Sequence, residues 1–188
     1  TGAVHLFYYI GNLSSNDQAI DAWIRHANKL DQRAKPIIDV AAFYPDTYLK
    51  LDDEALRYRW ASTYFTVART LREEVDFDYA SEQMIEDGAL SRYKVLILLW
   101  GVVMEKSTLE RIDRWVRDGG ILVFCPRARG NPVTVEGDFS ISNRWLAGDT
   151  GKGKVISWRG EVIPALEFTE GMKDLLLKTP SLHPRIQA

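Results

Sequence analysis

The sequence has few of the features that commonly identify a site or a cellular partner. Its single cysteine, Cys125, excludes an internal disulfide, and nothing in the sequence points to a zinc cluster. The 24 lysine and arginine residues nearly balance the 26 aspartate and glutamate residues, which gives no basic surface for nucleic acid or anionic lipid. The longest apolar stretch, residues 95–104, is about half a membrane span. We therefore expect neither nucleic acid nor a membrane as a partner, and no metal or cofactor.

What the sequence does contain is the composition of a globular domain. Its 188 residues are 46% hydrophobic and 11% aromatic. A chain of this length can bury roughly 70% of the surface that it exposes when unfolded. The composition excludes a disordered tail, a coiled coil and a collagen-like fibre.

Short apolar runs that end at turn residues predict β-strands. Those at residues 37–44, 94–99 and 121–125 are almost wholly apolar, which is typical of strands buried on both faces. Residues 75–79 alternate in polarity and predict a strand nearer the sheet edge. Two further strands are predicted at residues 5–10 and 154–158.

Apolar residues spaced three or four apart predict helices between these strands. One helix begins near Ser15 or Asn16, and another begins near Asp52 or Asp53 and carries an apolar stripe to Leu71. Further helical segments are expected before Gly88, over residues 107–118 and from Pro164. Strands that alternate with helices indicate a parallel sheet covered on both faces. The predicted fold is therefore a three-layer α/β sandwich with a mainly parallel sheet of about five strands.

The segment from 107 to 125 has the clearest local signals. Ser107 and Glu110 have the spacing of a capping box, which predicts a helix beginning at Ser107. The buried face of this helix is predicted to consist of Leu109, Ile112 and Val116. Gly119 and Gly120 then supply the left-handed residue that ends a helix, and a buried strand follows at once.

Residues 126–152 form a long excursion rich in glycine, proline and asparagine. Short strands are expected around 133–135 and 139–141. Residues 148–154 fit G-x-x-x-x-G-K by count, but a phosphate loop needs Ser or Thr next and a helix after it. Because Val155 follows and a strand begins there, we interpret these residues as a turn that leads into the strand.

Two stretches together resemble a known family. The first is VDFDY at 75–79 followed by GALSRYKVLIL at 88–98, and the second is residues 109–124, which end in WVRDGGILVF. They resemble the class I glutamine-amidotransferase-like domain that follows the catalytic barrel in some glycoside hydrolases. The trimerisation domain of family-42 β-galactosidases is the best-known case. The resemblance covers about residues 37–160 and consists of hydrophobic runs and glycines.

This resemblance implies a flavodoxin-like sheet that usually lacks amidotransferase chemistry and helps to assemble the enzyme. The partner it implies is an attached or neighbouring glycosidase domain, and a homo-oligomer is compatible with it. Residues 1–36 would be a strand–helix extension, the end of a preceding domain, and residues 37–188 the amidotransferase-like domain. The leading hypothesis is therefore a non-catalytic accessory or assembly domain of a carbohydrate-active enzyme.

Cys125 is the basis of an alternative, a small-molecule hydrolase or amidotransferase. The family's catalytic members carry a cysteine on a sharp turn after a strand, and Cys125 ends the strand at 121–125. However, Pro126 has no N–H to serve as oxyanion donor, a loss of about 3–4 kcal/mol of transition-state stabilisation. It also favours an extended Cys125, and Arg127 stands where a close-packed turn needs glycine. The family's His-x-Glu pattern is missing around all three histidines, His5, His26 and His183.

The third hypothesis is a standalone ligand-binding module. Open α/β sheets bind ligands at the carboxyl ends of their strands. That edge would hold Tyr44, Asp46, Ser81, Glu82, Trp100, Cys125, Arg127 and Arg129. The candidate ligand contacts among them are Asp46, Glu82, Trp100 and Arg127.

Overall fold

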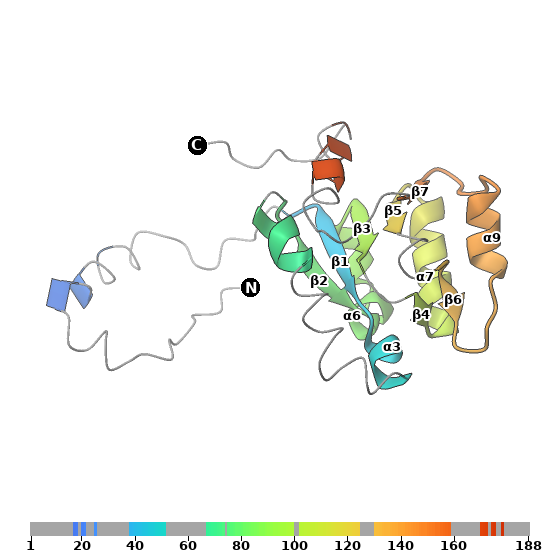
Figure 1. Cartoon of the computed structure of the whole chain (residues 1–188), viewed down its shortest axis with the longest axis horizontal. Coiled ribbons are helices and arrows are strands. Elements are labelled where there is room, and N and C mark those ends of the chain that lie inside the picture. Colours follow the sequence, from blue (N-terminus) through green and yellow to red (C-terminus); the bar gives the residue numbers. More distant parts are fainter. Residues whose placement is uncertain are drawn as a thin grey trace. The chain divides into compact units, whose positions relative to one another are not determined.

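A computed structural model gives the structure of the protein (Figure 1). It describes residues 17–18, 20–21, 25, 38–51, 67–73, 75–99, 102–124, 130–158, 170–172, 174–175 and 178. The chain divides into two compact units, Thr1–Ile37 and Ile38–Ala188. Everything described below belongs to the second unit.

The second unit is built on one parallel sheet. Its strands are β1 (Val40–Tyr44), β2 (Asp78–Ser81), β3 (Val95–Leu98), β5 (Ile121–Phe124) and β7 (Lys154–Ser157). All four neighbouring pairs are parallel, and the strands lie side by side in the order β2-β1-β3-β5-β7. Numbered along the chain within this sheet, that order is 2-1-3-4-5, the flavodoxin-like arrangement. The predicted parallel sheet of about five strands is confirmed, and β2 lies at an edge as expected.

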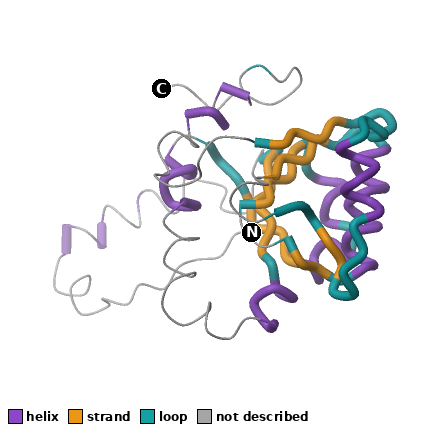
Figure 2. Tube along the Cα trace, turned by 45° about the vertical axis from the view of Figure 1, so that its right-hand side comes forward, coloured by secondary structure: helices purple, strands orange, loops and turns teal. Residues whose placement is uncertain are grey.

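Alternate residues of the central strands contribute to two separate cores. One face of the sheet presents Val40, Ala42, Val95, Ile97 and Val123. They pack against Val67, Leu71 and Met172. The other face presents Ala41, Phe43, Leu96, Leu98, Leu122 and Phe124. They pack against Ile85, Leu109, Ile112 and Val116. Figure 2 shows the strands as a layer with helices on both sides, so the three-layer prediction is confirmed.

Helices and short strands fill the connections. The helices are α3 (Asp46–Leu51), α6 (Glu82–Glu86), the 3-10 turn η1 (Ala89–Arg92), α7 (Lys106–Arg117) and α9 (Ser140–Leu146). Residues 67–73 are also helical, as are 170–172 and 174–175. A separate two-stranded parallel sheet pairs β4 (Val103–Met104) with β6 (Val133–Thr134).

The start of α7 differs from the predicted capping box. The helix begins at Lys106, and its N-cap residue, Glu105, makes no side-chain cap hydrogen bond. Ser107 lies inside the helix, and its side chain hydrogen-bonds Glu86 of α6 instead. A tertiary partner therefore outcompetes the local cap. The predicted face is confirmed, because Leu109, Ile112 and Val116 are each 0% exposed.

The end of α7 follows the prediction. Gly119 has a φ of 125°, which a residue with a side chain rarely adopts, and β5 begins two residues later. Gly120 lies so close to the indole of Trp115 that a Cβ there would overlap the ring. The helix, Gly-Gly and strand thus form one tight unit.

Three other predictions need correction. The strand expected at 75–79 instead covers Asp78–Ser81, because its pairing with β1 begins where Asp78 lies opposite Ala41. A helix, α3, begins at Asp46, where only a turn after Pro45 was expected. Residues 139–141 begin helix α9 rather than a strand, because Ile141 and Trp145 are spaced four apart and both pack against the core beside α7.

Several predicted segments lie outside the described residues. These are the strand at 5–10, most of the helix from residue 16, residues 52–66 and the tail from residue 179. Val67 and Leu71, from the predicted stripe, are buried as expected. In the part of the chain that the structure describes, no helix has the length and apolarity needed to cross a membrane.

Candidate functional site

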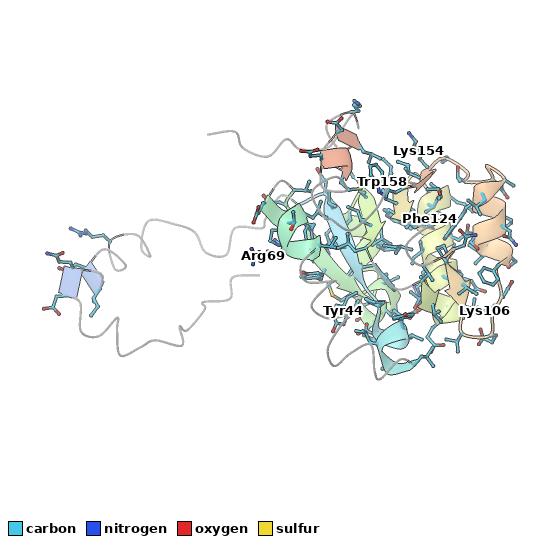
Figure 3. The ribbon with its side chains drawn as sticks, viewed as in Figure 1. Tyr44, Arg69, Lys106, Phe124, Lys154 and Trp158 are labelled. Atoms are coloured by element: carbon cyan, nitrogen blue, oxygen red, sulfur yellow. The ribbon has the colours of Figure 1, made fainter. Side chains whose placement is uncertain are left out.

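The carboxyl ends of β1 and β2 lie together, because the two strands are parallel neighbours. Tyr44 of β1 is in register with Ser81 of β2. Asp46 begins α3 two residues beyond the first strand, and Glu82 begins α6 directly after the second. The edge is close to the switch point between β1 and β3, where flavodoxin-like folds bind ligands. Figure 3 shows Tyr44 beside α3 at this edge.

Glu82 is a buried carboxylate that binds two other helices. The residue is 6% exposed. Its Oε1 accepts the backbone N–H of Thr47, in the first turn of α3, at 2.7 Å. Its Oε2 accepts the backbone N–H of Glu105, the N-cap of α7, at 3.1 Å. Free N–H groups and a favourable dipole make helix N-termini suitable partners for a carboxylate.

Asp46 makes the reciprocal contact. Its Oδ2 accepts the backbone N–H of Glu82 at 3.0 Å. Ser81 completes the cap of α6 by accepting the N–H of Met84 at 3.2 Å. The carboxylates of Asp46 and Glu82 therefore each bind the first turn of the other's helix. The structure brings these two predicted site residues together, and gives both a role in fixing helix N-termini.

The other predicted site residues lie outside the described part of the chain. These are Trp100, Cys125 and Arg127, together with Arg129 from the same predicted edge. Their roles, catalytic or ligand-binding, stay predictions. Among the described residues, no group of three or more His, Cys, Asp or Glu side chains is placed to hold a metal ion.

A polar groove that no sequence pattern predicted lies between α7, α9 and β6. Its volume is about 340 Å³. Lys106, Glu110 and Arg114 line it from α7, where a spacing of four residues places them on one face. The opposite wall comes from Asp138, Ser140 and Arg144. Figure 3 labels Lys106 at the first turn of α7.

An ion-pair network holds α9 against α7. Asp113 is 7% exposed, and its Oδ1 accepts the indole N–H of Trp145 at 2.8 Å. Its Oδ2 accepts Arg144 at 2.9 Å and Arg117 at 3.3 Å. Asp149 then accepts Arg117 at 2.8 Å and pairs with Arg144 at 3.8 Å, which closes the network. A signal for this network was present in the sequence, because Asp113 and Arg117 are four residues apart on the predicted helix.

The loop before α9 is fixed by Asp138. Its carboxylate accepts the backbone N–H of Ser140 at 2.8 Å and the hydroxyl at 3.0 Å. These two hydrogen bonds lower the pKa of Asp138, and the nearby Lys106 ammonium adds to the effect. The Thr134 hydroxyl is the main cause that lowers the pKa of Glu136 in the same loop.

A similar contact joins α6 to α7. Burial raises the pKa of Glu86, but hydrogen bonds from Ser107, Arg111 and Thr108 outweigh it, and the net shift is downward. The Arg111 guanidinium also forms an ion pair with Glu86. The first two turns of α7 are thus attached to α6 through polar contacts.

No protein-family model and no curated protein matches the chain. Similar solved structures include a catalytic mutant of a GH42 β-galactosidase from G. stearothermophilus, with 22% identity and a TM-score of 0.45. That match covers 57% of this chain and 16% of the other. A β-galactosidase from Bacillus circulans sp. alkalophilus has 21% identity, a TM-score of 0.39, and coverage of 50% and 14%. The GH42 exo-carrageenase from Bacteroides ovatus has 13% identity, a TM-score of 0.49, and coverage of 84% and 19%.

These structural neighbours are GH42 β-galactosidases and a related glycosidase, matched at low identity and over part of the chain. This chain matches less than a fifth of the length of each, as the shares of 16%, 14% and 19% state.

Proposed function

We propose that this chain is a non-catalytic accessory or assembly domain of a glycoside hydrolase. The sequence resemblance of residues 75–79, 88–98 and 109–124 to the amidotransferase-like domain of such enzymes supports the proposal. The strand order 2-1-3-4-5 agrees with the flavodoxin-like sheet that this resemblance implies. Residues 1–36 are then the end of the preceding domain, and the partner is an attached or neighbouring glycosidase domain.

The observation that carries the non-catalytic part concerns Glu82 and Asp46. A general acid or base must reach the proton that it transfers. Both oxygens of Glu82 instead accept backbone N–H groups, from Thr47 and Glu105, and the residue is 6% exposed. Transfer of a proton through Glu82 would break a contact that fixes α3 or α7. The carboxylates of Asp46 and Glu82 are therefore better placed to stabilise the fold than to transfer protons.

A hydrolase assay on the chain itself tests this proposal. The chain and its Cys125→Ala variant are assayed with nitrophenyl glycosides and with glutamine. We expect the same background rate for both proteins with every substrate. Turnover by the unsubstituted chain that the variant loses would contradict the accessory role and favour the amidotransferase or hydrolase alternative.

The reactivity of Cys125 supplies a second readout. A catalytic thiol forms its thiolate well below the ordinary pKa of about 8.5. We expect the rate of alkylation to follow an ordinary thiol, or alkylation to require unfolding. A thiolate already formed near neutral pH would count against the proposal even if no substrate had been found.

A further inference from the structure

The groove between α7, α9 and β6 has the dimensions of a small-molecule site. Its volume of about 340 Å³ lies at the lower end of the range for ligand pockets, roughly 300–1,000 Å³. Ile141 gives it apolar contact area, and polar side chains surround this residue. The groove uses none of the strand-end residues Asp46 and Glu82.

Charges of both signs line the groove in equal number. The cations are Lys106, Arg114 and Arg144, and the anions are Glu110, Asp113 and Asp138. An anionic ligand between Lys106 and Arg114 would meet Glu110, which lies between them on the same helix face. A cationic ligand beside Glu110 would meet those two cations. The lining therefore gives no net attraction to a ligand of either charge.

Part of this polar lining is held in place before any ligand arrives. Arg144 is fixed by Asp113 at 2.9 Å, yet its side chain stays 42% exposed. Asp138 is fixed by both the N–H and the hydroxyl of Ser140. Preorganised groups bind a ligand without the entropy loss of ordering them first.

Two other groups are available to a ligand. Among the residues that the structure describes, neither Glu110 nor Arg114 forms an ion pair. Glu110 can only accept hydrogen bonds when ionised, and Arg114 can only donate them. A hydroxyl group does both, so one polyol can satisfy the two side chains together.

We infer that this groove binds a neutral polyhydroxylated ligand with the size of a mono- or disaccharide. Its hydroxyls bridge the carboxylate of Glu110 and the guanidinium groups of Arg114 and Arg144. Its apolar ring face lies over Ile141, which is partly exposed. The inference does not rest on the proposed accessory role, because it uses only the lining of the groove.

Sugars that share a ring but differ in charge give the first test. Glucose, galactose and mannose are titrated against the ¹⁵N-labelled chain, with glucuronate and glucosamine as charged comparators at constant ionic strength. We expect at least one neutral sugar to shift amide signals of α7 and α9 with a Kd below about 10 mM, and the charged comparators to bind more weakly. Failure of all three neutral sugars to bind, or equal binding of a charged one, would overturn the inference.

Matched substitutions locate the site. Glu110→Gln and Arg114→Gln are compared with Glu170→Gln and Arg69→Gln, two exposed residues that lie outside the groove. We expect each groove variant to weaken binding about tenfold, the effect of losing one charge-assisted hydrogen bond. The control substitutions should leave the Kd unchanged, and all four variants should have the melting temperature of the unsubstituted protein. Equal weakening by the controls, or none by the groove variants, would place the ligand elsewhere.

The outcome of the sugar titration does not depend on the outcome of the hydrolase assay. A chain that binds no sugar can still be an accessory domain of a glycosidase. A chain with its own Cys125-dependent turnover can still bind a sugar between α7 and α9. The location of the shifted amide signals therefore tests only the proposal that the groove binds a sugar.

Discussion

Glu82 shows how one side chain can serve several helices. Its two oxygens accept N–H groups from Thr47 and Glu105, which lie 35 residues before it and 23 residues after it. Its own N–H is accepted by Asp46. The first turns of α3, α6 and α7 are therefore connected at one point, beside the ends of β1 and β2.

Substitution of Glu82 tests how much this connection between the three helices stabilises the protein. Glu82→Gln keeps one acceptor oxygen but turns an NH₂ group toward a backbone N–H. We expect the free energy of unfolding to fall by about 2 kcal/mol, because leaving a buried donor unpaired costs about 1–3 kcal/mol. Urea denaturation measures the loss, with the exposed Glu170→Gln as control. An unchanged unfolding midpoint would show that the carboxylate does not hold the three helices.

The sequence could predict the neighbourhood of these residues but not their contacts. Asp46 and Glu82 follow two strands of a parallel sheet, and the ends of parallel strands meet at one edge. The hydrogen bonds depend on where α3 and α7 begin, which tertiary packing decides. Ser107 shows the same limit, since its capping-box spacing was overridden by a contact with Glu86.

At the scale of elements, α9 depends on α7. It is a seven-residue helix, too short to be stable alone in water. Trp145 is 3% exposed and Asp113 accepts its indole N–H. The burial of Trp145 and the ion pairs of Arg144 together hold α9 in place. The local sequence predicted only a loop with short strands here.

Substitution of Asp113 should release α9 selectively. Asp113→Ala leaves the buried indole N–H of Trp145 unpaired and removes the shorter of the two ion pairs of Arg144. We expect a destabilisation of about 2–3 kcal/mol and faster hydrogen exchange at the amides of α9 than at those of β3. Asp118→Ala, an exposed residue at the end of the same helix, is the control. Exchange that stays slow in α9 would mean that the network does not anchor it.

The turn that leads into β7 packs against the end of α7. Gly153 is so close to the carbonyl oxygens of Val116 and Gly120 that a Cβ would overlap them. Lys152 donates its backbone N–H to the Arg117 carbonyl at 2.9 Å, so the contact is between backbones. The prediction of a turn rather than a phosphate loop is confirmed, since β7 begins at Lys154.

Alanine substitutions distinguish this close approach from simple backbone strain. Gly153→Ala forces two backbone segments apart, and we expect a loss of more than about 2 kcal/mol. Gly130→Ala meets no atom of the described residues within 4 Å and suffers only the cost of its φ of 88°, about 1 kcal/mol. Thermal denaturation of both variants measures the difference. Equal losses would indicate that β7 and α7 can move apart freely.

The stability of the whole molecule should depend on pH through Tyr93. Burial is the main cause that raises the pKa of Tyr93 to about 12, and a hydrogen bond that its hydroxyl donates to Asp78 at 3.0 Å adds to it. The unfolded chain releases this proton near pH 10.0, so the contribution is full below that pH. It is lost as the pH rises toward about 12.

Urea denaturation at several alkaline pH values measures this dependence. We expect the unfolding free energy of the unsubstituted protein to decline above pH 10. Tyr93→Phe lacks the hydroxyl and should decline less over the same range, though it begins from a lower stability at neutral pH. Parallel curves for the two proteins would show that another group controls alkaline unfolding.

At this largest scale, the sequence predicted the architecture better than the local detail. Near-continuous apolar runs such as Val95–Leu98 indicated strands covered on both faces, and alternation with helices indicated their parallel order. These signals extend along the chain, and several of them indicate the same fold. The groove between α7 and α9 was not predictable, because it exists only where a short helix that lacks strong local signals docks on a longer one.

The most direct test of the accessory role is the nucleotide sequence upstream of the codon for Thr1. We expect the same reading frame to encode a barrel-sized α/β domain with a pair of catalytic carboxylates. A start codon immediately before Thr1, or an upstream domain with no glycosidase character, would contradict the accessory role.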